Sequence, residues 1–130
     1  MSKFEFNQLY LQLERDIKHL AFTTEIEYRN EALEDAQDVI SKLKNEIENW
    51  VLQLNKRNIA CYELENLLES KRVEIALIRL NSKGLSEERI ETFKGDILRF
   101  IAKAILNIYL DSLFRNQNRK LNQNDFFIEN

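Results

Sequence analysis

The chain has 130 residues, of which 44% are hydrophobic and 32% charged, and its formal net charge is −3. This composition is typical of one globular domain and excludes a disordered chain, and the small negative charge gives no overall reason to expect nucleic acid as a partner. The chain contains no proline and only two glycines, Gly84 and Gly95. Because proline and glycine are the usual residues of turns and hairpins, their scarcity predicts an all-α protein built from long helices.

The first predicted helix covers residues 3–21. Phe6, Leu9, Leu13, Ile17 and Leu20 follow one another at steps of three or four residues. This spacing places them on one face of a helix that turns toward a core.

A seven-residue repeat then runs through the middle of the chain. The first series is apolar throughout: Ile26, Leu33, Ile40, Ile47, Leu54, Cys61, Leu68 and Ile75. The second series, three residues later in each heptad, is apolar except at Arg29, Arg57 and Lys71. A sustained heptad is typical of helices that supercoil around each other. We expect the seam to be buried at Ile40, Ile47, Leu54, Leu64 and Leu68.

Two interpretations of this repeat stay open. In the first, one helix runs from Glu25 to about Asn81, and three long helices form an antiparallel bundle with coiled-coil-like heptad packing that pairs in a dimer. In the second, the helix breaks near Asn55 to Asn58 and one chain closes a four-helix bundle. The unbroken register favours the continuous helix, although a helix of that length is rare.

The clearest boundary in the sequence lies at Gly84. Glycine readily adopts the left-handed conformation that ends a helix, and Ser86 can cap the next one. The last helix is predicted from Glu87 to about Phe114 or slightly beyond, and it is apolar nearly all round, which predicts burial on most sides. Gly95 within it indicates a close helix crossing.

The domain is expected to span residues 1–115, followed by a flexible, polar C-terminal tail over residues 116–130. This tail ends in an apolar cluster at Phe126, Phe127 and Ile128. We expect the cluster to dock on its own bundle, since exposed aromatic clusters are unusual without a partner. The alternatives are that it covers a dimer seam or anchors another protein.

Charge is distributed unevenly along the chain. Residues 25–48 contain eight acidic and three basic side chains, whereas residues 94–120 contain six basic and two acidic ones. Mutual neutralisation of these two segments within the fold is the simplest interpretation.

The sequence offers no convincing catalytic or metal-binding group. His19 is the only histidine, so Asp16 and His19 cannot complete a di-iron carboxylate site within one chain. Cys61 occupies a heptad core position and is expected to be a buried structural residue. We therefore expect a non-enzymatic protein that needs neither a metal nor an organic cofactor.

These observations predict a protein–protein interaction module: a scaffold, an adaptor or an inhibitor of the antitoxin or immunity type. It is expected to be a homodimer with an unidentified protein partner. The alternative is a nucleic-acid-binding accessory subunit that uses the basic end of the last helix, with Tyr109 and Phe114 beside the basic residues. The candidate partner-binding residues are Arg99, Lys103, Arg115, Arg119, Lys120, Phe126 and Phe127. The N-terminus lacks the pattern of a secretory signal and the most apolar window is interrupted by polar residues, so a cytoplasmic protein without a membrane span is expected.

Overall fold

The computed structural model describes the backbone of residues 3–129 and the side chains of residues 5–115. Within this part of the chain the regular structure is entirely helical, which confirms the all-α prediction. The helices are α1 (Lys3–Phe22), α2 (Arg29–Lys42), α3 (Lys44–Asn55), α4 (Cys61–Glu69), α5 (Ile78–Lys83) and α6 (Glu87–Glu129), with short 3₁₀ turns at Ile26–Tyr28 and Arg72–Glu74.

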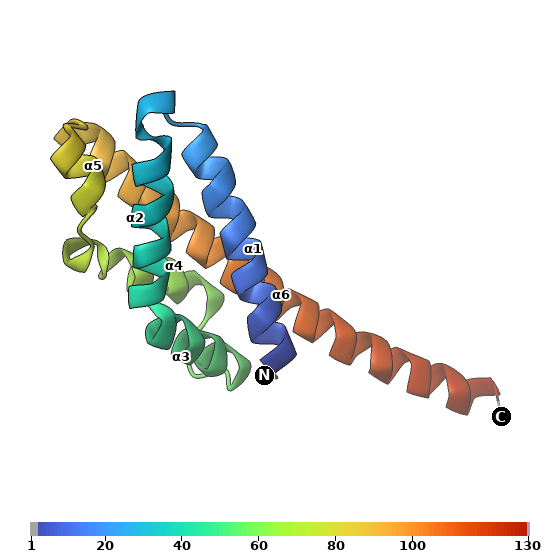
Figure 1. The fold of residues 1–130 in the computed structure, drawn as a ribbon. Coiled ribbons are helices and arrows are strands. Elements are labelled where there is room, and N and C mark those ends of the chain that lie inside the picture. The colour runs from blue at the N-terminus through green and yellow to red at the C-terminus, as the bar shows by residue number, and fades with distance from the viewer. Residues whose placement is uncertain (1–2, 130) are drawn as a thin grey trace.

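Helix α6 is the element on which the fold is assembled (Figure 1). Helices α1, α3 and α4 pack against it, and α2 packs on α1 and α5. The part of α6 inside the bundle is the most deeply buried, with Ile97, Ile101 and Ile105 fully covered. Facing them are side chains from the other helices, among them Leu9, Leu13, Ile47, Leu54, Leu64, Leu68 and Leu80, which are also fully buried.

The prediction of one continuous helix from Glu25 to Asn81 is wrong. Helices α2 and α3 are separated by Leu43 alone, and α3 then ends at Asn55, which confirms the alternative break near Asn55 to Asn58. Arg57 has a left-handed backbone with φ of 61°, and the Asn58 amide donates a hydrogen bond to the Gln53 side chain at 2.7 Å. The chain breaks again between α4 and α5, so the predicted bundle of three long helices is not formed.

The heptad seam is buried only in part. Ile47, Leu54, Leu64 and Leu68 are buried as predicted, while Ile40 is half-buried at the edge of the core. At other positions of the repeat, Ile26, Cys61 and Ile78 are exposed. The repeat therefore matches burial within α3 and α4 and fails where the chain breaks.

The boundary at Gly84 is confirmed in detail. Gly84 has φ of 99°, and the Oγ atom of Ser86 accepts the backbone N–H of Arg89 at 3.3 Å at the start of α6. At Gly95, the neighbour is the side chain of Arg72 and not the backbone of a crossing helix.

The last helix is longer than predicted. It continues to Glu129, so the backbone of the predicted flexible tail is helical up to that residue. At 1.5 Å per residue α6 is about 65 Å long, and its C-terminal part projects from the bundle alone (Figure 1). The backbone at residues 126–128 is thereby carried away from the bundle on which the apolar cluster was expected to dock.

Candidate partner-binding surface

The predicted basic residues lie on α6, and the described ones are exposed. Arg99, Lys103 and Arg115 all face solvent. The Nη2 atom of Arg99 is 2.6 Å from the Oδ1 atom of Asp96, whereas Lys103 and Arg115 form no ion pair within the described residues. The remaining candidates, Arg119, Lys120, Phe126 and Phe127, have backbones on α6 but side chains outside the described residues.

The structure does not gather these basic residues on one face. Arg99 and Lys103 are one turn apart, but Arg115 is twelve residues beyond Lys103 and therefore about 120° further round the helix. Arg115 lines a hollow of about 280 Å³ between α1 and α6, together with Arg15. Beside Arg99 lies one further basic residue, Arg72, which lines another hollow together with Arg99 and is paired with Glu69 and Glu91.

Two large apolar residues share a face with Lys103. Leu110 is 54% exposed and Phe114 is 63% exposed. They follow Lys103 by seven and eleven residues, so all three lie within a narrow sector of α6. We call the residues Arg99, Lys103, Leu110 and Phe114 the exposed stripe of α6.

Burial of α6 on most sides is therefore found only between Ile97 and Ile105, where the helix contacts the other helices. Further along, Asp111 and Arg115 still line the hollow against α1, whereas Leu110 and Phe114 on another side of α6 face solvent. The exposure of Leu110 was not predicted, because a helix that is apolar all round does not show which of its faces lacks a neighbour. The available signal was the seven-residue spacing that leads from Phe114 to Leu121 and Ile128.

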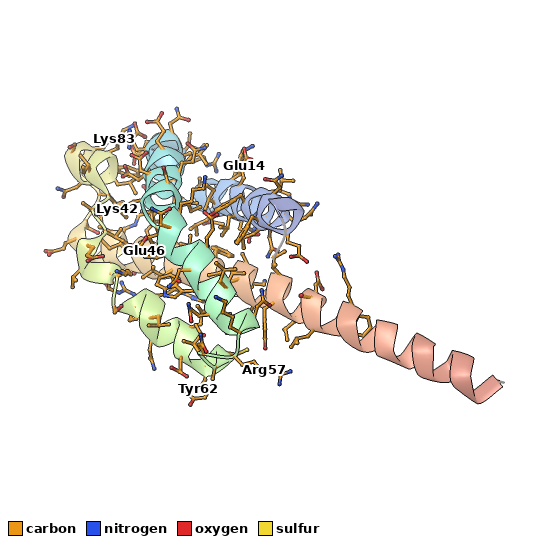
Figure 2. All side chains as sticks on the ribbon, turned by 90° about the horizontal axis from the view of Figure 1, so that it is seen from below. Glu14, Lys42, Glu46, Arg57, Tyr62 and Lys83 are labelled. Carbon is orange, nitrogen blue, oxygen red and sulfur yellow. The ribbon has the colours of Figure 1, made fainter. Side chains whose placement is uncertain are left out.

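Contrary to the expectation, the acidic segment forms no ion pair with the described basic residues between 94 and 115. Its ion pairs reach instead to the segment between α4 and the start of α6. Within the described residues the pairs are Glu25 with Arg89, Glu31 with Lys83, Glu34, Asp35 and Asp38 with Arg79, and Glu46 with Lys71. Figure 2 shows Lys83 on the side of α5 next to α2. The positive charge of Lys103 and Arg115 thus stays available to a partner.

The most buried charged side chain, Asp35, has a structural role. It is 1% exposed, and its Oδ2 atom accepts the backbone N–H of Leu80 at 2.9 Å. Its Oδ1 atom accepts the backbone N–H and the Nη1–H of Arg79 at 3.3 and 3.2 Å. Because the residue before α5 provides no side-chain cap, Asp35 of α2 supplies the acceptors for the first turn of α5. Hydrogen bonds to Asp38 and Asp35 raise the pKa of Arg79 above its ordinary value.

A shallow apolar hollow of about 280 Å³ lies between α1 and the α2–α3 segment. Leu13, Ile17 and Ile40 form its walls, with Glu14 and Lys44 among its polar lining. The hydroxyl of Tyr10, which also lines it, donates to the Oε2 atom of Glu48 at 2.9 Å. Burial, followed by this hydrogen bond, raises the pKa of Tyr10 well above its ordinary value, so the phenol stays neutral and is a poor acid–base group.

The other chemistry-bearing residues considered from the sequence lie apart from such hollows. Cys61 is exposed at the first turn of α4, so its predicted burial in the core is wrong. Cys61 is exposed because the break after α3 places it at the start of a helix. The neighbouring residues Tyr62 and Arg57 lie at the edge of the bundle (Figure 2). His19 is exposed on α1. Among the described residues, no three His, Cys, Asp or Glu side chains converge as they would around a metal ion.

Comparison with known proteins gives no relative: no family model, curated protein or solved structure matches this chain. Among the described residues, none of the helices combines the length and apolar character required to cross a membrane.

Proposed function

We propose that this protein acts by protein–protein contact and that the exposed stripe of α6 is its contact surface. The observation that carries the proposal is the exposure of Leu110 and Phe114 on a side of α6 other than the one that lies along α1. The described part of the chain places no other element over this face, while the rest of the apolar residues of α6 are largely covered. The activity is binding, without turnover and without a cofactor.

Burial of the Leu110 and Phe114 side chains against a partner contributes favourable binding free energy. Removal of a Leu or Phe side chain from water is worth about 1.5–3 kcal/mol when burial is complete. Exposed aliphatic and aromatic anchors at helical spacing are the means by which one helix enters the groove of a partner, as in helix-in-groove recognition. Lys103, which forms no ion pair within the described residues, favours an acidic residue on the partner beside the apolar contact.

A protein partner fits this surface better than nucleic acid. Nucleic-acid binding relies on several Lys and Arg side chains that follow the phosphates along one surface. Arg115 lies about 120° round α6 from Lys103, and Arg99 is already paired with Asp96. The alternative function stays a prediction, and the same experiment tests it.

The test compares three forms of the full chain as bait: wild type, Leu110→Glu with Phe114→Glu, and Val73→Glu. Val73 is 89% exposed on the 3₁₀ turn at Arg72–Glu74, outside the exposed stripe, and controls for the introduction of acid at an apolar surface site. We expect a protein that is retained by wild type and by Val73→Glu and lost with the double variant. The same protein, once purified, should bind wild type directly in titration calorimetry.

Circular dichroism and thermal unfolding of all three forms establish that the bundle is intact. A ligand retained equally by the double variant would contradict the proposal. So would capture that disappears after nuclease treatment, because the partner would then be a nucleic acid.

A further inference from the structure

The seam that begins on the exposed stripe continues along the projecting part of α6. Leu110 is followed at intervals of seven by Gln117 and Asn124, and Phe114 is followed at the same interval by Leu121 and Ile128. The backbone is helical throughout this stretch. These residues therefore occupy the d positions (Leu110, Gln117, Asn124) and the a positions (Phe114, Leu121, Ile128) of one heptad seam.

The composition of this seam is that of a helix that pairs with another helix. A lipid-facing or core-facing stripe is uniformly apolar, whereas this seam alternates apolar a layers with amide d layers after Leu110. Single amides at seam positions fix the register and the number of strands of a coiled coil, because they hydrogen-bond to one another across the interface. A Gln or Asn side chain has both a donor and an acceptor, so it can pair with an identical copy of itself.

The flanking charges are also self-complementary. Lys120 occupies a g position and Asp125 the e position five residues later. In a parallel two-stranded coiled coil, each g residue lies beside the e residue of the following heptad on the other helix. Two identical chains in register would thus form this opposite-charge pair twice.

From this register we infer that the partner of the projecting helix is a second copy of this chain, joined in a parallel, in-register coiled coil over residues 110–129. The inference rests on the proposed function and specifies one partner for its surface. The preceding d residue is Lys103, where two copies would repel each other, so the paired segment begins at Leu110. The two bundles then lie at the same end of the dimer.

Sedimentation equilibrium of the full chain from about 1 to 100 µM measures the association. We expect a monomer–dimer equilibrium in this range, and a monomer throughout for Leu121→Glu with Ile128→Glu. Both substitutions lie outside the bundle, so the thermal unfolding of the bundle should be unchanged. Val73→Glu should dimerise like wild type.

Charge exchange tests the parallel register. Lys120→Glu and Asp125→Lys should each weaken the dimer by roughly tenfold at low salt, since each turns two attractive pairs into two repulsive ones. The double variant Lys120→Glu with Asp125→Lys should restore the wild-type dissociation constant to within about threefold. Additive weakening in the double variant would overturn the proposed register.

Single cysteines give a direct readout of orientation in a Cys61→Ser background. Gln117→Cys should form a disulfide-linked dimer on mild oxidation, because identical d positions face each other, whereas Arg119→Cys at an outward f position should not. Equal crosslinking at both sites would overturn the inference. So would disulfide formation only between a mixture of Gln117→Cys and Leu121→Cys, which would indicate an antiparallel pair.

A chain that is monomeric at every concentration would overturn the inference. The proposed function would still stand if that monomer captured a different protein that is lost in the Leu110→Glu, Phe114→Glu variant. The two failures are therefore distinguishable.

Discussion

The guanidinium of Arg72 occupies the space that a side chain at position 95 would fill. A Cβ atom added to Gly95 would lie 2.9 Å from the Nη2 atom of Arg72. The same guanidinium donates from Nη1 to the backbone carbonyl of Glu91 at 2.9 Å, one turn earlier on α6. The glycine in the middle of α6 thus admits an arginine that ties the 3₁₀ turn at Arg72–Glu74 to the main helix.

This relationship predicts that the effect of Gly95→Ala depends on Arg72. Alanine in a helix interior is favoured over glycine by about 1 kcal/mol, but in the wild type the new methyl group must displace the guanidinium. We expect Gly95→Ala to stabilise the Arg72→Ala background by about 1 kcal/mol and to stabilise the wild type less or not at all. A double-mutant cycle from urea unfolding measures this coupling, and equal effects in both backgrounds would show that the two residues are independent.

Asp35 is predicted to be essential for the docking of α5. Asp35→Ala leaves the buried N–H of Leu80 without its acceptor and removes the acceptor of Arg79, and should cost about 2–4 kcal/mol of unfolding free energy. The exposed Asp38 contacts the same guanidinium, and Asp38→Asn is the matched control with a much smaller expected effect. Urea unfolding compares the two variants, and similar losses would show that burial of Asp35 is unimportant.

Alanine substitution at two residues of the same heptad series should lower the free energy of unfolding by different amounts. Ile47 is fully buried and Ile40 is half-buried beside the hollow between α1 and α2. Ile47→Ala should cost about 2–5 kcal/mol, and Ile40→Ala clearly less because its cavity opens to solvent. Equal destabilisation in thermal and urea unfolding would contradict the assignment of the core boundary.

The all-helical class could be predicted because the chain lacks proline and has few glycines. The helix boundary at Gly84 and Ser86 could be predicted because glycine readily adopts a left-handed backbone and a serine hydroxyl caps a helix. The number of helices in the heptad region could not be predicted, since an apolar residue in every seven is compatible with one long helix or with several short ones. The decision came from Arg57, a residue without glycine's freedom that nevertheless adopts positive φ. The sequence marked Arg57 only as a polar interruption of the second series within the alternative break at Asn55 to Asn58.

The candidate surface was predictable in part for a similar reason. Arg99 and Lys103 were identified from their charge and are exposed on the proposed surface. Phe114 was grouped with the basic end, but the exposure of Leu110 was not predicted, because it depends on which side of α6 the other helices cover. The exposure of Cys61 was missed because its core position assumed an unbroken helix.

A titration tests the pairing of α2 with α5. The hydrogen bond from Lys83 to Glu31, at 3.0 Å, lowers the pKa of the Glu31 carboxyl below its ordinary value of 4.5. A carboxyl with a lowered pKa in the folded state contributes stability above the ordinary value, and this contribution is lost as the pH falls through the lowered pKa. Carboxyl ¹³C shifts should show Glu31 titrating below 4.5 in the wild type and closer to 4.5 in Lys83→Met. An unchanged midpoint in that variant would contradict the pairing.

The central claim, that the protein functions through the exposed stripe of α6, is tested most directly by site-specific photocrosslinking in the native cell. A photoreactive amino acid placed at position 110 or 114 should form a covalent adduct with a protein, either a second copy or another chain. The same group at position 73, which is more exposed but lies on the 3₁₀ turn outside the exposed stripe, should form none. Adducts at position 73 with none at 110 and 114, or adducts with nucleic acid in place of protein, would contradict the account.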